Sequence, residues 1–464
     1  MEKDKPRSNC GVVAVFGNPD ASRLAYLALY ALQHRGQESA GIVSGDGTKV
    51  YRYTGEGLVA DIFSQQRIFD DLPGHFAIGH NRYSTTGSSS LRNVQPLLVT
   101  HNNGFFAIGH NGNLTNSGDL RERLEQKGSL FQTTTDTEVV CHLIARSRKK
   151  SMPEKIVEAL QQLQGAYSLV MLTQDRIYAA RDPHGVRPLC LGKNENAYFV
   201  VSETCALDLL RAESLCDVAP GELLEISSEG LRRWRISEPK PRYACIFEFI
   251  YFARPDSRIF EENVDKVRRK IGKTLALESP VDADIVISVP DSSNTAALGY
   301  ARRTDMKFEL GLIRNHYVGR TFIRPKQEMR DFAVRVKFNP VKGVLKDRRI
   351  VVVEDSIVRG TTLKQLVSLI RLAGAKEIHV RVSSPPILSP CFYGMDFPSS
   401  SELIAHRLSV PEIREFLECD SLAYLSEKGL LESVPHEMGG YCTACFSGNY
   451  PIPIERNIGK YQHE

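Results

Sequence analysis

The sequence has no apolar run near the roughly 20 residues that a membrane helix requires. It also lacks an excess of charge of one sign, because 59 basic and 55 acidic residues leave a net charge of only +4. Neither a nucleic acid nor a membrane is therefore expected as a partner. The first nine residues are charged, but no apolar signal-peptide core follows them. These absences predict a cytoplasmic protein.

Internal repeats and long low-complexity segments are absent as well. The chain has 464 residues, which is too many for one ordinary hydrophobic core and predicts two domains. Ten cysteines in a cytoplasmic chain are not expected to form disulfides. Some are expected to pack as small apolar residues, and any with ligand spacing need a separate explanation.

The two halves of the sequence differ in pattern. Short strand-like runs such as GVVAVFG and HFAIGH fill residues 10–237, with helical stretches at 22–36 and 135–150, which favours layered α+β structure. A proline-containing segment, 237–258, then crosses to the second half. Residues 238–464 alternate strand-like runs (ADIVISVP, RRIVVVED) with helical stretches, which predicts an α/β domain with a parallel sheet and a partly helical C-terminal segment.

One strand-loop-helix unit in the second half has the features of a phosphate site. The run RRIVVVED ends in two acids, Glu354 and Asp355, and a short loop then leads to a helix beginning near Thr361. Free backbone N–H groups at a helix start bind phosphate, and Gly360 allows close approach. Two carboxylates would repel phosphate, so they fit sugar hydroxyls or a hydrated Mg²⁺.

The string VVVEDSIVRGTT closely resembles the phosphoribosyl pyrophosphate (PRPP) signature of type I phosphoribosyltransferases. The resemblance implies PRPP-binding residues Glu354, Asp355, Ser356, Arg359, Gly360, Thr361, Thr362 and Lys337. It also implies that Mg²⁺ is bound at Ser292, in the loop VPDSSNTAA, together with Glu354 and Asp355. Residues 317–337 resemble the loop that closes over PRPP. Many members have aspartate where this chain has Glu354, whose carboxylate reaches further outward.

Five motifs occur in order in the first half: CGVVAVFG, LQHRGQESAG, GHNRYSTTG, GHNGNLTN and TTTDTE. Together they resemble class II glutamine amidotransferases, which are N-terminal nucleophile (Ntn) hydrolases with a four-layer αββα fold. The resemblance implies Cys10 as nucleophile and its own α-amine, with a pKa of about 7.7–8.0, as base. An internal amide has no such basicity. Residues 1–9 are therefore predicted to be a propeptide that must be removed.

The same resemblance assigns the other parts of a glutamine site. Asn111 and the Gly112 N–H are expected to stabilise the tetrahedral oxyanion. Glutamine-binding residues are expected at Arg35, Arg82, Thr85 and Asp136. Among these, Arg82 suits the substrate carboxylate and Asp136 suits its ammonium group. Arg35 is expected to support the part of the site around Cys10.

Cys442 and Cys445 form a C-x₂-C pair, which zinc sites, redox pairs and chance all produce. One bacterial type of amidophosphoribosyltransferase carries a [4Fe–4S] cluster, and its four ligands correspond to Cys245, Cys391, Cys442 and Cys445. A structural Cys₄ zinc site is the competing interpretation. The remaining cysteines are expected at mostly buried apolar positions: Cys141, Cys190, Cys205, Cys216 and Cys419.

From Cys10 to about Asn449 the chain thus resembles the amidophosphoribosyltransferases, an Ntn hydrolase domain (10–237) followed by a type I phosphoribosyltransferase domain (238–464). The resemblance implies glutamine and PRPP as substrates, ammonia transfer between domains, a homotetramer, and purine nucleotides as feedback inhibitors. Two alternatives compete with this interpretation: the string VVVEDSIVRGTT argues against the first, and the presence of Cys10, Arg82, Asn111 and Asp136 argues against the second. One is another class II amidotransferase such as glucosamine-6-phosphate synthase, and the other is a nucleotide-binding regulator without catalysis.

Overall fold

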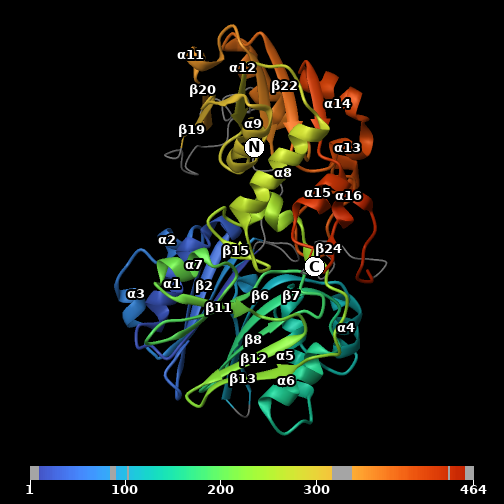
Figure 1. Ribbon diagram of the computed structural model, residues 1–464. Coiled ribbons are helices and arrows are strands. Elements are labelled where there is room, and N and C mark those ends of the chain that lie inside the picture. Colours follow the sequence, from blue (N-terminus) through green and yellow to red (C-terminus); the bar gives the residue numbers. More distant parts are fainter. Residues whose placement is uncertain (1–9, 84–89, 102–103, 316–336, 437–438, 455–464) are drawn as a thin grey trace.

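Two antiparallel sheets form the N-terminal part of the chain, drawn blue to green in Figure 1. The computed structural model describes residues 10–83, 90–101, 104–315, 337–436 and 439–454. In spatial order, the first sheet contains β11 (Glu213–Asp217), β9 (Cys190–Lys193), β10 (Tyr198–Val201), β1 (Gly11–Phe16), β4 (Phe76–Arg82), β2 (Ser39–Gly45) and β3 (Val50–Glu56). The second contains β13 (Gly230–Arg235), β12 (Glu222–Ser227), β8 (Ile177–Arg181), β7 (Gly165–Leu172), β6 (Gly104–Leu114) and β5 (Leu97–His101).

Helices cover the outer face of each sheet, so the N-terminal domain has the expected four layers. Side chains of both sheets, such as Val12 and Val170, share one buried core between them. The first sheet is covered by α1 (Ala21–Ala31), α2 (Val59–Ile62), α3 (Arg67–Asp70) and α7 (Cys205–Leu209). The second is covered by α4 (Ser117–Glu125), α5 (Thr137–Arg146) and α6 (Met152–Leu160). The αββα Ntn hydrolase architecture is therefore confirmed.

The C-terminal domain, drawn yellow to red in Figure 1, is built on a parallel sheet, as predicted. Its strand order is β18 (Lys307–Phe308), β17 (Ile285–Ser288), β21 (Arg349–Glu354), β22 (Glu377–Val382) and β23 (Ser421–Tyr424). One face is covered by α8 (Val264–Glu278), α9 (Asn294–Thr304) and α15 (Glu427–Ser433), the other by α12 (Thr361–Leu372) and α14 (Val410–Leu417). Because both faces of the sheet are covered, the central strands β17 (IVIS) and β21 (RIVVVE) are almost continuously apolar in sequence.

Shorter elements complete the two domains and the segment between them. They are 3₁₀ helices η1 (Gln33–Arg35), η2 (Leu91–Asn93) and η5 (Ser400–Glu402), the π-helix η3 (Glu248–Phe252), helices α11 (Lys342–Leu345), α13 (Ile404–Arg407) and α16 (Ala444–Ser447), and strands β14 (Ala244–Cys245), β15 (Arg258–Ile259), β16 (Glu262–Asn263), β19 (Leu312–Arg314), β20 (Phe338–Pro340) and β24 (Tyr441–Cys442). No helix within the described ranges is long and apolar enough to cross a membrane.

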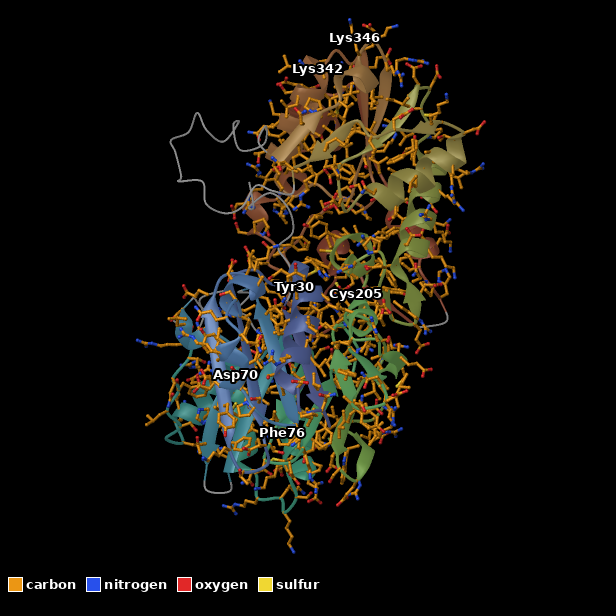
Figure 2. All side chains as sticks on the ribbon, turned by 90° about the vertical axis from the view of Figure 1, so that its left-hand side faces the viewer. Tyr30, Asp70, Phe76, Cys205, Lys342 and Lys346 are labelled. Carbon is orange, nitrogen blue, oxygen red and sulfur yellow. The ribbon has the colours of Figure 1, made fainter. Side chains whose placement is uncertain are left out.

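The domains share a continuous apolar core rather than meeting at a thin linker. Ala166 and Val186 of the N-terminal domain belong to the same buried cluster as Phe247 and Tyr393. Figure 2 shows Lys342 and Lys346 at the far tip of the C-terminal domain, and Tyr30 and Cys205 at the end of the N-terminal domain that faces it. This packing places both domains in direct contact near η3.

Candidate functional site

Cys10 lies directly before β1, and its side chain is buried. Its Sγ atom lies 3.5 Å from the Tyr83 carbonyl oxygen, and the next residue, Gly11, donates its N–H to Asn81 Oδ1 at 2.7 Å. Burial raises the pKa of the Cys10 thiol to about 11, although the Tyr83 contact and the charge of Arg82 oppose the shift. The thiol is therefore protonated at neutral pH and needs a base to become a nucleophile.

Charged side chains surround this thiol. Arg82, Glu38 and Asp136 all act electrostatically on Cys10. Burial lowers the pKa of the Arg82 guanidinium, an effect that the nearby anionic groups partly offset. Asp136 lies directly before α5, and its Oδ2 accepts a hydrogen bond from the Leu114 N–H at 2.9 Å. A cation and an anion near one thiol suit the two charged ends of a free amino acid. Thr85, the other predicted glutamine ligand, lies outside the described residues.

Asn111 lies in β6, which packs against β1 and β4. The side chain is fully buried, and neither Oδ1 nor Nδ2 has a hydrogen-bond partner in the part of the chain that the structure describes. Such an orphaned amide is costly, about 1–3 kcal/mol, and points to a missing ligand. At Gly112, φ is +147° and an added Cβ would lie 2.1 Å from the Ala166 carbonyl oxygen, so only glycine fits. These features suit an oxyanion site.

Arg35 has partners other than a substrate. Its guanidinium bonds Glu203 and, from Nη2, Glu248 at 2.6 Å, and all three side chains are fully buried. Burial alone would lower the pKa of Arg35, but the two carboxylates raise it above its usual range. Burial alone would raise the pKa of Glu203, yet Arg35 and His34 hold it well below its usual range. The Arg35 guanidinium is thus bound to Glu203 and to Glu248, which lies in the segment that crosses between the domains. Its predicted contact with glutamine stays a prediction.

In the C-terminal domain the loops after β17 and β21 meet at one sheet edge, because these parallel strands are neighbours. Ser292 donates to Asp355 Oδ2 at 2.5 Å, and Ser293 donates to Glu354 Oε1 at 3.5 Å. Ser356 donates to the other Asp355 oxygen at 2.6 Å. The structure therefore brings together Ser292 and both acids, the group predicted to bind Mg²⁺. Both carboxylates are buried, and serine hydroxyls donate hydrogen bonds to their side-chain oxygens.

The remaining predicted PRPP residues surround the start of α12. Gly360 has φ of +79° and precedes Thr361, and an added Cβ would lie 2.9 Å from Ile404 Cδ1. Arg359 donates to Glu402 Oε1 from Nε and Nη2 at 3.2 and 2.8 Å. Thr362 is half-buried in the first turn of α12. Lys337 precedes β20, with its Nζ 5.6 Å from the Phe338 ring centre, whereas residues 317–336 of the predicted closing loop lie outside the described residues.

Arg268, in α8, lies between this acid group and the domain crossing. It is buried, and it donates to the Phe249 carbonyl from Nε at 2.6 Å and to the Ala253 carbonyl from Nη2 at 2.8 Å. Burial lowers the pKa of its guanidinium to about 10, and the charge of Asp355 opposes this shift most strongly. A single cation therefore links the backbone around η3 to the predicted PRPP acid.

The four predicted cluster cysteines converge from three segments. Cys245 and Cys442 are register partners in the parallel pair of β14 and β24. Cys445 interacts electrostatically with Cys442, Cys245 and Cys391. Burial raises the pKa of the Cys245 thiol to about 11 and shifts those of Cys442 and Cys445 in the same direction. Within the described ranges, however, no three Cys, His, Asp or Glu side chains are spaced to bind a metal ion.

The five other cysteines fit the predicted apolar role except at one position. Cys141, Cys190, Cys205 and Cys419 are buried, whereas Cys216 is half-buried and its sulfur accepts a hydrogen bond from Arg233.

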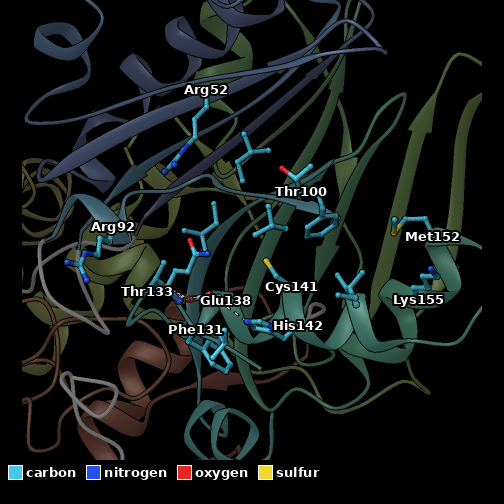
Figure 3. Close-up of a pocket in the computed structure, with 18 of the residues that line it drawn as sticks. Arg52, Arg92, Thr100, Phe131, Thr133, Glu138, Cys141, His142, Met152 and Lys155 are labelled. Atoms are coloured by element: carbon cyan, nitrogen blue, oxygen red, sulfur yellow. Dashed lines mark hydrogen bonds and ion pairs between the residues drawn. The ribbon is translucent and has the colours of Figure 1, made fainter. Parts of the chain in front are cut away.

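Cys141 also lines a hollow of about 1220 Å³ beside β5 and α5 (Figure 3). Glu138, which also lines the hollow, has structural partners, because it accepts from the Gln132 and Thr133 N–H groups at 2.9 and 2.7 Å. None of the predicted site residues lines this hollow.

Several charged residues near the two sites were not predicted from sequence: the half-buried Glu38 and the buried Arg187, Glu203, Glu248 and Arg268. For two of them, the sequence contains a pattern from which burial could have been predicted. Glu203 in VVSETCA and Glu248 in CIFEFIYF are lone acids within apolar stretches, which indicates a buried charge with a partner. The sequence does not reveal that partner, because Glu248 meets a residue 213 positions away.

Comparisons with known proteins agree with this two-domain structure. Residues 80–209 match the family model of a glutamine amidotransferase domain. Amidophosphoribosyltransferase 2, chloroplastic, of Arabidopsis thaliana is 53% identical over 459 residues, 98% of this chain and 82% of the relative. The Bacillus subtilis amidophosphoribosyltransferase is 48% identical over 450 residues, 96% of this chain and 94% of the relative.

Two solved structures superpose on almost the whole chain, each with a TM-score of 0.93. One, described as the allosteric regulatory enzyme of purine biosynthesis, is 47% identical and is matched over 97% of both chains. The other is glutamine phosphoribosylpyrophosphate amidotransferase from B. subtilis complexed with ADP and GMP, 46% identical over 98% of this chain and 100% of that one. Identity near one half over nearly the full length, with the same fold, shows that the chain belongs to the amidophosphoribosyltransferase family.

Proposed function

We propose that the chain couples glutamine hydrolysis in its N-terminal domain to amination of PRPP in its C-terminal domain. The ammonia released from glutamine displaces pyrophosphate from C1 of PRPP and gives 5-phosphoribosylamine, the first step of purine biosynthesis. The observation that carries this proposal is the occurrence, in one chain, of a buried thiol beside Arg82 and Asp136 and of a serine-carboxylate group at the edge of a parallel sheet. Membership of the family supports the same reaction.

In the glutaminase half, Cys10 acts after residues 1–9 have been removed. Its new α-amine takes the thiol proton, and the thiolate attacks the amide carbon of glutamine to form a tetrahedral oxyanion. This intermediate collapses with transfer of the proton to the leaving nitrogen, which releases ammonia and leaves a glutamyl thioester on Cys10. Water then hydrolyses the thioester to glutamate and regenerates the thiol. The raised pKa of the Cys10 thiol supports the need for such a base. Arg82 and Asp136 bind the ends of the substrate, and the unpartnered Asn111 amide with the Gly112 N–H stabilises the oxyanion.

In the transferase half, the backbone N–H groups at the start of α12 bind the 5′-phosphate, with Gly360, Thr361 and Thr362 forming the contact surface. Ribose hydroxyls replace the serine hydroxyls that now bond Glu354 and Asp355. Oxygen donors of Ser292, Glu354 and Asp355 suit Mg²⁺, which would supply positive charge to the leaving pyrophosphate when bound.

The four converging cysteines are proposed to bind a [4Fe–4S] cluster, which would make this chain the iron–sulfur type of the family. Four cysteines from three chain segments are a donor set that either iron–sulfur or structural zinc accepts. Such a group would fix β14, β24 and the segment before Cys391 to one another. Anaerobically purified protein should contain iron and sulfide, and stoichiometric zinc in their place would overturn the cluster proposal.

Regulation and assembly are also part of the proposal. Purine nucleotides are proposed to inhibit the enzyme, which the ADP and GMP complex of the B. subtilis relative supports. The chain is proposed to form a homotetramer, which light scattering at several protein concentrations tests directly.

Paired activity measurements test the central proposal. Cys10→Ala should abolish glutamine-dependent release of pyrophosphate from PRPP and retain synthesis from added ammonia. Asp355→Ala should abolish both, and Cys216→Ser, a half-buried cysteine outside both sites, should change neither. Intact mass should show loss of residues 1–9 in the active form. If PRPP fails to stimulate glutamine hydrolysis by the wild-type protein, the coupled reaction is wrong.

A further inference from the structure

A short segment of the C-terminal domain lies directly on the oxyanion strand of the N-terminal domain. We call residues Phe392–Gly394 the strap. An added Cβ at Gly394 would lie 2.8 Å from the Gly112 carbonyl carbon, 2.9 Å from its Cα and 3.1 Å from its oxygen. These are main-chain atoms, which cannot move aside as the end of a flexible side chain can. The two glycine backbones are therefore in direct contact across the domain boundary.

Hydrogen bonds hold the strap in this position. Asn113, next to Gly112, donates from Nδ2 to the Phe392 carbonyl at 3.0 Å. Arg187 donates to the Tyr393 carbonyl from Nε at 3.0 Å and from Nη2 at 2.7 Å, and its Nη1 donates to Glu248 at 3.3 Å. Arg187, Glu248 and Tyr393 are all buried. The strap thus has a fixed carbonyl at each of two successive residues.

Gly112 is held from its other side as well. It pairs with Tyr167 of the neighbouring strand β7, and the Ala166 carbonyl lies so close that a Cβ on Gly112 would be 2.1 Å from it. Gly112 therefore lies between β7 and the strap. An oxyanion donor acts only when its N–H points within about 2.7–3.1 Å of the developing charge, so both neighbours influence the direction of that N–H.

We propose that the strap positions the Gly112 N–H for glutamine hydrolysis, with Gly394 as a positioning residue supplied by the other domain. This inference rests on the proposed glutaminase function of Cys10, Asn111 and Gly112. It predicts that the N-terminal domain depends on the C-terminal domain for the rate of its chemical step, and not for holding glutamine, because the strap contacts Gly112, Asn113 and Arg187 rather than the side chains of Arg82 or Asp136.

Gly394→Ala tests the proposal in the full-length enzyme. We expect kcat for glutamine hydrolysis to fall about 10- to 100-fold, part of the loss seen when an oxyanion donor is removed. The KM for glutamine should change less than about threefold, since the contacts that bind glutamine equally in the ground state and the transition state are unchanged. Ammonia-dependent synthesis should stay within about twofold of wild type. Gly374→Ala is the matched control: its φ of +96° is close to the +103° of Gly394, but its nearest neighbour is the Lys346 side chain.

Each outcome decides the proposal. An unchanged kcat, a rise in KM alone, or equal loss of glutamine- and ammonia-dependent activity would each overturn it, as would an equal effect of Gly374→Ala. If Gly394→Ala does not fold, Asn113→Ala, which removes a strap hydrogen bond without adding volume, must lower kcat for glutamine hydrolysis and leave ammonia-dependent synthesis intact. Wild type is measured first: absence of any glutaminase activity there would contradict the proposed function itself, a separate result.

Discussion

At the scale of single residues, Asn111 shows that a site can be marked by what a side chain does not contact. Its amide is fully buried, yet it has no hydrogen-bond partner within the described ranges. Folding normally avoids this arrangement, because an unsatisfied buried amide costs about 1–3 kcal/mol. Such an arrangement is expected where a ligand completes the hydrogen bonds, which is the reason for proposing Asn111 as an oxyanion donor despite its cost to stability.

Asn111→Ala should therefore separate activity from stability. We expect kcat for glutamine hydrolysis to fall about 10²- to 10³-fold, because a preorganised oxyanion donor is lost. The thermal midpoint should hold or rise, since no hydrogen bond of the folded protein is removed. Steady-state kinetics and thermal denaturation check the two halves. A lower midpoint with normal kcat would show that the amide serves the fold instead.

The pH dependence of Cys10 alkylation is a second residue-scale prediction. Burial raises the pKa of this thiol to about 11, so the reactive thiolate is scarce at pH 7 and its fraction rises about tenfold per pH unit up to that value. In protein that retains residues 1–9, iodoacetamide labelling of Cys10 should therefore keep increasing beyond pH 10. After removal of residues 1–9 the new α-amine should shift the profile toward neutral pH. Peptide mass spectrometry measures both profiles, and identical profiles would argue against the α-amine as base.

At the scale of elements, the C-terminal domain depends on one very close helix pair. An added Cβ at Gly272 of α8 would lie 1.9 Å from the Ala296 carbonyl oxygen of α9, and one at Gly299 of α9 would lie 2.2 Å from the Arg269 carbonyl oxygen. The two helices therefore approach backbone to backbone. This contact positions α9, which follows the Ser292 loop, and α8, which carries Arg268.

Gly272→Ala sets two effects of opposite sign against each other. Alanine favours a helix over glycine by about 1 kcal/mol, but the clash with a main-chain oxygen must move α8 away from α9, which outweighs that gain. We expect a lower thermal midpoint and weaker PRPP binding. Gly343→Ala in α11 is the control, because an added Cβ there meets no atom within 4 Å, and it should be neutral or stabilising. Equal midpoints for the two variants would contradict the close packing.

Elements with unambiguous patterns could be predicted from sequence. The run RIVVVE is buried on both faces as β21, and the motifs around Cys10 and Asn111 fall on β1 and β6. Helix α4 was missed because its sequence, SGDLRERLE, holds only two large apolar residues, Leu120 and Leu124, which is too few for a clear helical stripe. Helix α6 was missed although Ser151 and Glu154 form a capping box, a signal readable from sequence.

Other features lie beyond any local pattern. The burial of Arg268 and the meeting of Gly394 with Gly112 join residues that are far apart in the chain. Local propensity carries no information on such pairs, because they depend on how the two domains pack. The strap contact, for example, exists only once β6 and the segment after Cys391 have been brought together by the shared core.

At the scale of the whole molecule, buried cations and anions connect the two sites. Arg35 and Arg187 of the N-terminal domain both bond Glu248, at the start of η3. Arg268 donates a hydrogen bond to the Phe249 carbonyl of the same π-helix, and burial lowers the pKa of its guanidinium while the charge of Asp355 opposes that shift. Partners removed from water in this way interact strongly and tolerate little displacement. We therefore expect a change in the charge around Asp355 on PRPP binding to act on the segment that holds the strap.

Arg268→Lys tests this connection, because lysine keeps the charge but cannot donate to two carbonyls in the same planar geometry. We expect stimulation of glutamine hydrolysis by PRPP to fall by about tenfold or more, while the rate without PRPP and ammonia-dependent synthesis change less than about threefold. Arg269→Lys is the matched control, since the adjacent Arg269 forms a half-exposed pair with Asp265 within one helix and should retain full stimulation. Glutaminase assays with and without PRPP measure the ratio, and thermal denaturation shows that both variants are folded. Retained stimulation in Arg268→Lys would mean that the two sites communicate by another route, such as closure of residues 317–337, and that the buried charges only hold the domains together.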